Sequence, residues 1–196
     1  MKVNALELFL KQKRFDLIFK YLYIKNRHKL PSFYEQLYLE HIRAFNGFYE
    51  VEPSDGQEKS TPEAFIRAFD RLYDNIKREG YDASKGSIPI GDNGEISDGA
   101  HRLTIAAVLG KDVEIENDGR ADLYDYKFFL KSNIYRPFAD FAAFEYVKLN
   151  PKAYIVNLHA VSPIENDPKV EEILNKYGSI YYKINVYLTT NGYINL

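Results

Sequence analysis

The stretch Ile88–Leu103 constrains the fold of this chain more than any other part of the sequence. It reads Ile-Pro-Ile-Gly-Asp-Asn-Gly-Glu-Ile-Ser-Asp-Gly-Ala-His-Arg-Leu. Two short runs, 88–90 and 95–97, flank an Asp-Asn-Gly turn at 92–94, which is typical of a β-hairpin. A glycine corner follows, and the apolar residues behind it predict a helix over 100–109. Strands followed directly by a helix predict a fold that mixes α and β structure.

The glycine corner, Asp98-Gly99-Ala100-His101-Arg102, is the candidate functional site. Gly99 lets the backbone approach a ligand closely, and the helix that follows offers N–H groups and a partial positive charge at its start. Arg102 adds a planar fork that can hold two phosphate or carboxylate oxygens. Together with an acid and a histidine, these groups suit phosphate chemistry. A structural interpretation stays open, in which Asp98 caps the helix and Arg102 pairs with a nearby acid.

The composition is that of an ordinary soluble globular chain, with 45% hydrophobic and 28% charged residues among 196. The net charge of −2 argues against broad nucleic-acid binding, which needs a strong basic excess. Cysteine is absent, which excludes disulfides and thiolate chemistry. No apolar run approaches the ~18 residues that a membrane span needs, and the first residues lack the apolar core of a signal peptide. We therefore expect a cytoplasmic protein.

Helical patterns dominate the first part of the chain. Apolar spacing predicts a helix over 4–27, interrupted near residue 13, and a second helix over 33–45. An Asn-Gly pair at 46–47 ends the second helix, because both residues tolerate the left-handed conformation. The histidines on these helices, His28 and His41, are interpreted as surface or packed residues rather than catalysts.

A further helix follows a polar stretch. Ser60 and Glu63 fit a capping box, and Pro62 falls in the first turn. Aromatic and aliphatic residues then recur at helical spacing up to Gly80, which ends the pattern. The sequence therefore predicts an amphipathic helix directly before the hairpin.

The C-terminal part alternates between helical and extended patterns. A short strand at 113–115 and a polar loop at 117–122 precede a helical region over 123–149, broken near Pro137. Three elements then predict a βαβ-like unit: a strand over 154–159, a helix over 168–176 and a strand over 180–188.

The residues Ile96-Ser97-Asp98-Gly99-Ala100-His101-Arg102-Leu103 also carry a family resemblance. The region from about Phe65 to Val113 resembles the ParB N-terminal/sulfiredoxin-like superfamily, in which a helix, a short strand pair and an Asp-Gly-X-His-Arg-Leu motif follow one another. Members include ParB CTP-binding domains, sulfiredoxins that use ATP, and free serine kinases. Because this chain has no cysteine, it departs from the sulfiredoxins, and it shows no helix-turn-helix domain of the ParB type. The free serine kinase branch fits best.

A second resemblance lies in the flanking segments Phe15–Leu22 and Phe45–Glu50. They are similar to parts of proteins encoded in bacterial capsule and lipopolysaccharide gene clusters. Together the two resemblances imply a nucleotide-dependent phosphotransferase, using ATP or another nucleotide with Mg²⁺. The implied acceptor is a small hydroxyl-bearing metabolite or sugar, in surface-polysaccharide biosynthesis.

The first resemblance also implies roles for the residues of the corner. Gly99, Ala100 and the fork of Arg102 would bind the nucleotide phosphates. His101 would donate a hydrogen bond to a phosphate or leaving oxygen. Asp98 would hold Mg²⁺, directly or through water, or would orient the acceptor.

An acid before the preceding helix would serve as the base in serine-kinase relatives. Glu52, Asp55 and Glu58 are all candidates for that base, and Glu58 fits best by position. Lys59 beside it could meet a phosphate. The same residues are also typical of a solvated polar loop before a helix.

Two other functions remain open at this point. The chain could be a non-catalytic module that binds a nucleotide or a partner in glycan assembly, or, less favoured by its charge, a ParB-like DNA-associated protein. In each case the expected fold is α+β. A helical N-terminal extension spans 1–50, a ParB/sulfiredoxin-like core with a small mixed sheet spans 51–118, and a C-terminal α/β extension spans 119–196.

Overall fold

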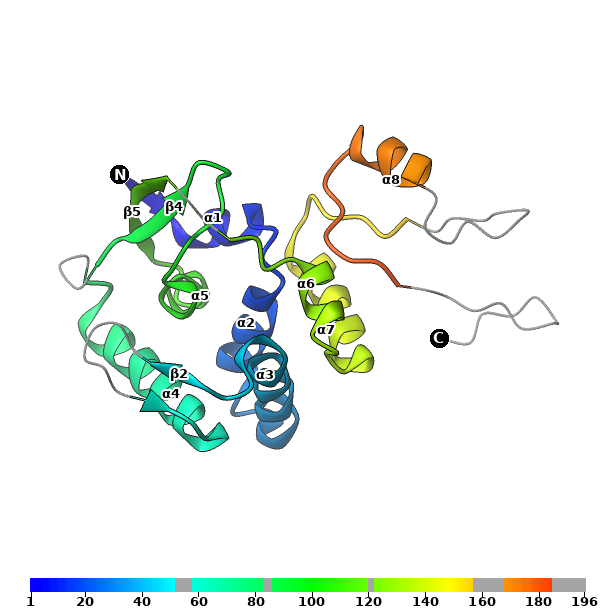
Figure 1. Cartoon of the computed structure of the whole chain (residues 1–196). Coiled ribbons are helices and arrows are strands. Elements are labelled where there is room, and N and C mark those ends of the chain that lie inside the picture. Colours follow the sequence, from blue (N-terminus) through cyan, green and yellow to red (C-terminus); the bar gives the residue numbers. More distant parts are fainter. Residues whose placement is uncertain (52–57, 83–85, 120–121, 157–167, 185–196) are drawn as a thin grey trace.

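The computed structural model describes residues 1–51, 58–82, 86–119, 122–156 and 168–184. Within these residues the chain forms eight helices, a three-stranded sheet and a two-stranded sheet (Figure 1). The predicted α+β class is therefore confirmed. No helix in the described residues is long and apolar enough to cross a membrane.

The larger sheet has the strand order β1-β5-β4. β1 (Lys2–Asn4) runs antiparallel to β5 (Asp112–Gly119), and β4 (Ile88–Gly91) runs parallel to β5. β5 extends well beyond the predicted strand 113–115, so the prediction of a loop beginning at 117 was wrong for 117–119. β1 pairs with residues 112–114 and β4 with residues 115–119, so β5 has a partner along its length and a polar sequence can stay extended.

The predicted hairpin after β4 is present in a reduced form. Gly91 N–H donates to the Glu95 carbonyl at 2.8 Å, and a single antiparallel bridge joins Ile90 to Ile96. Ser97 N–H donates to the Pro89 carbonyl at 3.0 Å, and Ile96 N–H, which points away from β4, donates to Gln12 Oε1 at 2.8 Å. Two backbone hydrogen bonds therefore hold the second arm against β4, and the Gln12 side chain satisfies the N–H on its outer side.

Three N-terminal helices follow β1: α1 (Ala5–Lys11), α2 (Asp16–Asn26) and α3 (Pro31–Asn46). The predicted interruption near residue 13 is confirmed, because α1 and α2 are separate. α3 begins earlier than predicted, at a proline, which is well suited to a first helical turn. It ends as predicted at Gly47, which has φ +65°.

β2 (Glu50–Val51) and β3 (Glu58–Lys59) pair antiparallel and lead into α4 (Pro62–Glu79). The N-cap of α4 is Thr61, whose side chain accepts from Ala64 N–H at 3.2 Å. The capping box predicted from Ser60 was therefore wrong by one residue, since Pro62 rather than Thr61 takes the first helical position.

α5 (Ala100–Val108) lies between the larger sheet and α4 and also packs against α1 and α2 (Figure 1). Leu103 and Ala106 belong to a large apolar core that α5 shares with α1, α2 and the sheet. Ile105 belongs to a second core, formed with α2, α3 and α4. Apolar packing on several sides therefore fixes the helix whose first turn carries the candidate site.

The C-terminal region contains α6 (Tyr126–Lys131), α7 (Arg136–Leu149) and α8 (Pro168–Asn175). The break near Pro137 and the helix α8 match the prediction. The described residues 153–156 and 178–184 on either side of α8 form no strand, so a βαβ unit is not borne out there. The remaining parts of those predicted strands, 157–159 and 185–188, lie outside the described residues.

Side chains rather than strand pairing hold this C-terminal region against the body. The ring of Tyr181 stacks on Tyr146 of α7 at 3.7 Å, and Tyr182 stacks on Phe15 at 5.0 Å. α8 lies beyond α6 and α7, and none of its residues is buried (Figure 1). Among the described residues, the apolar runs beside α8 have no neighbouring strand with which to form a sheet.

Candidate functional site

The corner begins with Gly99, which is the N-cap of α5. Its backbone is left-handed, with φ +77° and ψ 20°, and its carbonyl accepts from Leu103 N–H at 2.8 Å. The left-handed conformation favours glycine, and a Cβ at this position would lie 2.7 Å from Ile88 Cδ1 and require that side chain to shift. Among the described residues no side chain caps α5, which excludes the interpretation of Asp98 as its cap.

The guanidinium of Arg102 lies between two glycines. Its Nη1 donates to the Gly86 carbonyl at 2.8 Å, and its Nη2 is 3.4 Å from Asp98 Oδ2. A Cβ on Gly86 would lie 2.7 Å from Nη1, and a Cβ on Gly99 would lie 3.1 Å from Nη2. Both glycines are therefore needed to place the arginine fork beside the first turn of α5.

Asp98 lies at the surface beside that fork, with its side chain 77% exposed. An exposed ion pair is worth about 0–1 kcal/mol, so an arriving phosphate can compete with Asp98 for Arg102. Nearby, Ser97 Oγ donates to Asp118 Oδ2 at 2.6 Å. The corner therefore carries both an arginine fork and exposed carboxylate oxygens.

The carboxylate of Asp98 fits Mg²⁺ only in part. In the described part of the chain, no three His, Asp or Glu side chains are grouped so that they could hold a metal ion. Mg²⁺ in nucleotide sites is usually bound by one or two carboxylates, with phosphate oxygens and waters completing an octahedron. Asp98 suits that arrangement and does not make a metal site by itself.

His101 faces away from the arginine fork, toward α3 and α4. Its Nε2 lies 3.0 Å from Tyr38 Oη, and its ring packs edge-on against Phe69 at a centroid distance of 4.5 Å. Burial, and next the charge of Lys20, hold the pKa of His101 well below its ordinary value, so the ring is neutral at pH 7. The structure thus does not bring the imidazole together with Arg102, and a side-chain contact between His101 and phosphate stays a prediction.

Glu58 and Lys59 lie on β3 rather than in a loop. Lys59 is only 8% exposed, and its Nζ is 2.7 Å from Glu50 Oε2 and 5.1 Å from the ring centre of Phe65. Glu58 is exposed on the same strand. The strand pairing replaces the expected solvated loop, and the base role of Glu58 stays a prediction. The other two candidates for the base, at 52 and 55, lie outside the described residues.

The sequence did not reveal a buried ionic network behind the corner. Asp16 is fully buried and accepts from Arg14 Nε at 3.0 Å and Nη2 at 2.9 Å, and from Lys20 Nζ at 2.6 Å. Lys20 Nζ is also 3.1 Å from His41 Nε2. Although burial opposes it, the two cations hold the pKa of Asp16 well below its usual range. The sequence signal that could have revealed this network is an Asp and a Lys four residues apart within a largely apolar helix.

This network reaches the candidate site through the backbone. Arg14 Nη1 donates to the Ile96 carbonyl at 3.2 Å, two residues before Asp98. Glu95 accepts from Lys13 N–H at 2.9 Å through Oε2. The segment between α1 and α2 therefore fixes the backbone that leads into the corner.

Two open surface depressions lie near the sheet rather than over the corner. One is bordered by Lys2, Tyr81 and Lys111, and the other by Met1, Ile90 and Asp92. Neither is lined by Asp98 or Arg102. The recognition elements of the corner are the backbone at the start of α5 and the arginine fork.

Comparison of the chain with protein-family models, with curated proteins and with solved structures finds no match. Function must therefore be argued from the geometry described above.

Proposed function

We propose that the corner at the start of α5 binds the phosphates of a nucleotide, and that the chain is a nucleotide-dependent phosphotransferase. The acceptor would be a small hydroxyl-bearing metabolite or sugar. One observation carries the proposal. The Arg102 guanidinium lies beside the start of α5, where Gly99 is the N-cap residue and no described side chain caps the helix. The resemblance to the free serine kinase branch of the ParB/sulfiredoxin-like superfamily points to the same chemistry.

To catalyse phosphoryl transfer, a protein mainly has to position the reacting groups and stabilise their charge. Backbone N–H groups in the first turn of α5 meet phosphate oxygens together with the helix dipole. Arg102 binds two further oxygens, exchanging its exposed pair with Asp98 for the more highly charged phosphate. A nucleotide thus gains directional contacts and charge neutralisation at one point of the surface.

The other residues have supporting roles in this proposal. Asp98 would bind Mg²⁺, which when bound neutralises phosphate charge. Glu58 would accept the proton of the acceptor hydroxyl, and Lys59 would contact a phosphate after exchanging its pair with Glu50. His101 would contribute its backbone N–H, because its ring is turned toward Tyr38. Surface-polysaccharide assembly would supply such hydroxyl acceptors.

A non-catalytic nucleotide-binding module is the second candidate. The position of His101 favours it, because the imidazole bonded to Tyr38 is turned away from the fork that would hold the phosphate. Among the described residues, proton transfer would then depend on Glu58. Release of ADP in the presence of Mg²⁺ and a hydroxyl acceptor separates an enzyme from a module that only binds.

We expect ATP with Mg²⁺ to raise the melting temperature of the wild-type protein. A ligand at about 100 times its Kd adds about 2.7 kcal/mol, which is about 5–10 °C for a domain of this size. Arg102→Ala should lose this shift. Arg102→Lys, the matched control that keeps the charge but not the fork, should retain only part of it.

Asp98→Asn tests the metal role at the same corner. The substitution removes a carboxylate that repels phosphate, so ATP without Mg²⁺ should bind at least as tightly as to the wild type. The additional shift that Mg²⁺ produces should disappear. An ATP shift of wild-type size in a folded Arg102→Ala protein would contradict the phosphate site.

A further inference from the structure

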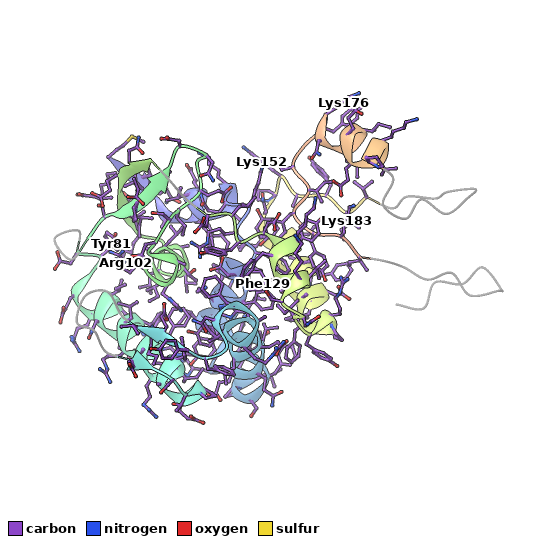
Figure 2. All side chains as sticks on the ribbon, viewed as in Figure 1. Tyr81, Arg102, Phe129, Lys152, Lys176 and Lys183 are labelled. Carbon is purple, nitrogen blue, oxygen red and sulfur yellow. The ribbon has the colours of Figure 1, made fainter. Side chains whose placement is uncertain are left out.

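Two residues outside the corner, Gly86 and Tyr81, belong to the same hydrogen-bonded unit as the arginine that the corner depends on. The Gly86 carbonyl accepts from Tyr81 Oη at 3.0 Å and from Arg102 Nη1 at 2.8 Å. Figure 2 shows Tyr81 and Arg102 side by side at the edge of the molecule. Because a carbonyl oxygen has two lone pairs, both donors can be satisfied at once. The three residues therefore form one hydrogen-bonded unit that joins Tyr81 and Gly86 to the first turn of α5.

We propose that Tyr81 and Gly86 are positioning residues that orient the Arg102 guanidinium for phosphate. This inference rests on the proposed function of the corner. Neither residue needs to touch the nucleotide. Each acts by fixing the plane and the rotation of the arginine fork.

Gly86 contributes through its missing side chain as well as its carbonyl. Its φ is +114°, a conformation that other residues rarely adopt, and a Cβ would lie 2.7 Å from Arg102 Nη1. Any other residue would push the guanidinium away. Glycine at 86 thus lets Nη1 reach the carbonyl.

The fixed Nη1 determines which edge of the fork faces the helix start. A Cβ on Gly99 would lie 3.1 Å from Nη2 and 3.4 Å from Nε of Arg102. The Nε–Nη2 edge therefore lies over Gly99, where the N–H groups of α5 begin. That edge matches two oxygens of a phosphate group. An arginine held in this way loses less rotational freedom when the phosphate arrives.

Tyr81 completes the unit as a hydrogen-bond donor. Burial raises the pKa of its phenol, while the charge of Arg102 acts in the opposite direction. The phenol is protonated at neutral pH and donates to Gly86. Without this phenol, the Gly86 carbonyl would lose one of its two side-chain donors, and Arg102 Nη1 would be less firmly placed.

The test compares ATP affinity and melting temperature in Tyr81→Phe and in a matched control. Tyr146→Phe is that control, because Tyr146 also donates from a phenol to a backbone carbonyl, that of Leu10, at 3.0 Å. Tyr81→Phe should weaken ATP binding about 2–10-fold, the factor expected for one neutral hydrogen bond. Tyr146→Phe should lower the melting temperature and leave the Kd for ATP unchanged at a temperature where both variants are folded.

Gly86→Ala and a spectroscopic measurement complete the design. Gly86→Ala should weaken ATP binding more than Tyr81→Phe, because it displaces Nη1 directly. In nitrogen NMR spectra of the unliganded protein, the two Nη signals of Arg102 should be separate in the wild type and merge in both variants as the guanidinium rotates freely.

The outcomes separate this inference from the proposed function. If Arg102→Ala abolishes ATP binding while Tyr81→Phe and Gly86→Ala bind like the wild type, the positioning role is wrong and the phosphate site stands. If Tyr146→Phe weakens ATP binding as much as Tyr81→Phe, the effect is general destabilisation and the positioning role is again wrong. If the wild type binds no nucleotide, the proposed function fails, and this inference fails with it.

Discussion

Gly99 shows how much of this site depends on one missing methyl group. The residue has a left-handed backbone and lies against Ile88 Cδ1, so an added Cβ would require the Ile88 side chain to move. A second glycine with a similar backbone, Gly94, has φ +80°, and a Cβ added there would meet no atom within 4 Å. Comparing alanine substitutions at the two glycines therefore separates the cost of the left-handed backbone from the cost of steric overlap.

Gly99→Ala should therefore destabilise the protein more than Gly94→Ala. Both variants incur about 1–2 kcal/mol for a left-handed alanine, and Gly99→Ala adds about 1–3 kcal/mol for overlap with Ile88. Urea unfolding gives both free energies directly. Equal losses in the two variants would show that Ile88 moves aside without cost.

At the scale of the element, the sequence leaves open which of two residues is the N-cap of α4, and the geometry of the folded chain decides it. Ser60 and Thr61 are adjacent and are both good N-cap residues. The structure selects Thr61, because it directly precedes the proline that opens the helix. The predicted helix was correct in kind and displaced by one residue at its start.

Thr61→Ala should cost about 0.5–2 kcal/mol of stability, the range for loss of an N-cap side chain. Ser60→Ala is the control, and it should leave the free energy of unfolding within about 0.5 kcal/mol, as for an ordinary surface change. Chemical denaturation of the two variants measures the difference. A larger loss in Ser60→Ala would restore the capping box that the sequence indicated.

At the scale of the whole molecule, the buried network joins parts that the sequence analysis assigned to separate regions. Asp16 and Lys20 on α2 meet His41 on α3, and Arg14 reaches the backbone at Ile96. β1 likewise completes the sheet that carries β4 and β5. The first 50 residues and the central region therefore share one polar network and one sheet.

This network should make stability depend on pH. His41 Nδ1 is bonded to the Tyr38 carbonyl and Nε2 faces the Lys20 ammonium, so the folded protein has no acceptor for a second ring proton. Burial, and next the charge of Lys20, hold the pKa of His41 well below 6.5, and the pKa of His101 is lowered in the same direction.

The unfolded chain takes up these protons near pH 6.5, whereas the folded chain does not. The free energy of unfolding should therefore be fully retained above about pH 6.5 and fall below it, by up to about 1.4 kcal/mol per pH unit for each histidine. His41→Gln keeps an acceptor for Lys20 without titrating, so its stability should fall less steeply. Urea midpoints between pH 4.5 and 7.5 measure both slopes, with exposed His28→Gln as the control. If stability falls equally steeply with decreasing pH in the wild type and in His41→Gln, His41 is not a cause of the pH dependence.

Local patterns determined most of the helices and the form of the corner. Helical spacing, Pro62, Gly47 and Gly80 mark helix starts and ends through interactions between near neighbours in the chain. The order of β4, turn, Gly99 and α5 was readable for the same reason. A turn needs particular residues wherever it occurs, and the sequence shows them directly.

Tertiary structure alone decided what depends on distant partners. The length of β5 depends on strands on both sides, and the strands expected around α8 have no neighbour in the described residues. The orientation of the His101 ring depends on Tyr38, and the position of the Arg102 guanidinium depends on Gly86. Each of these contacts joins residues far apart in the chain, and its free energy appears only when packing has brought the two partners together.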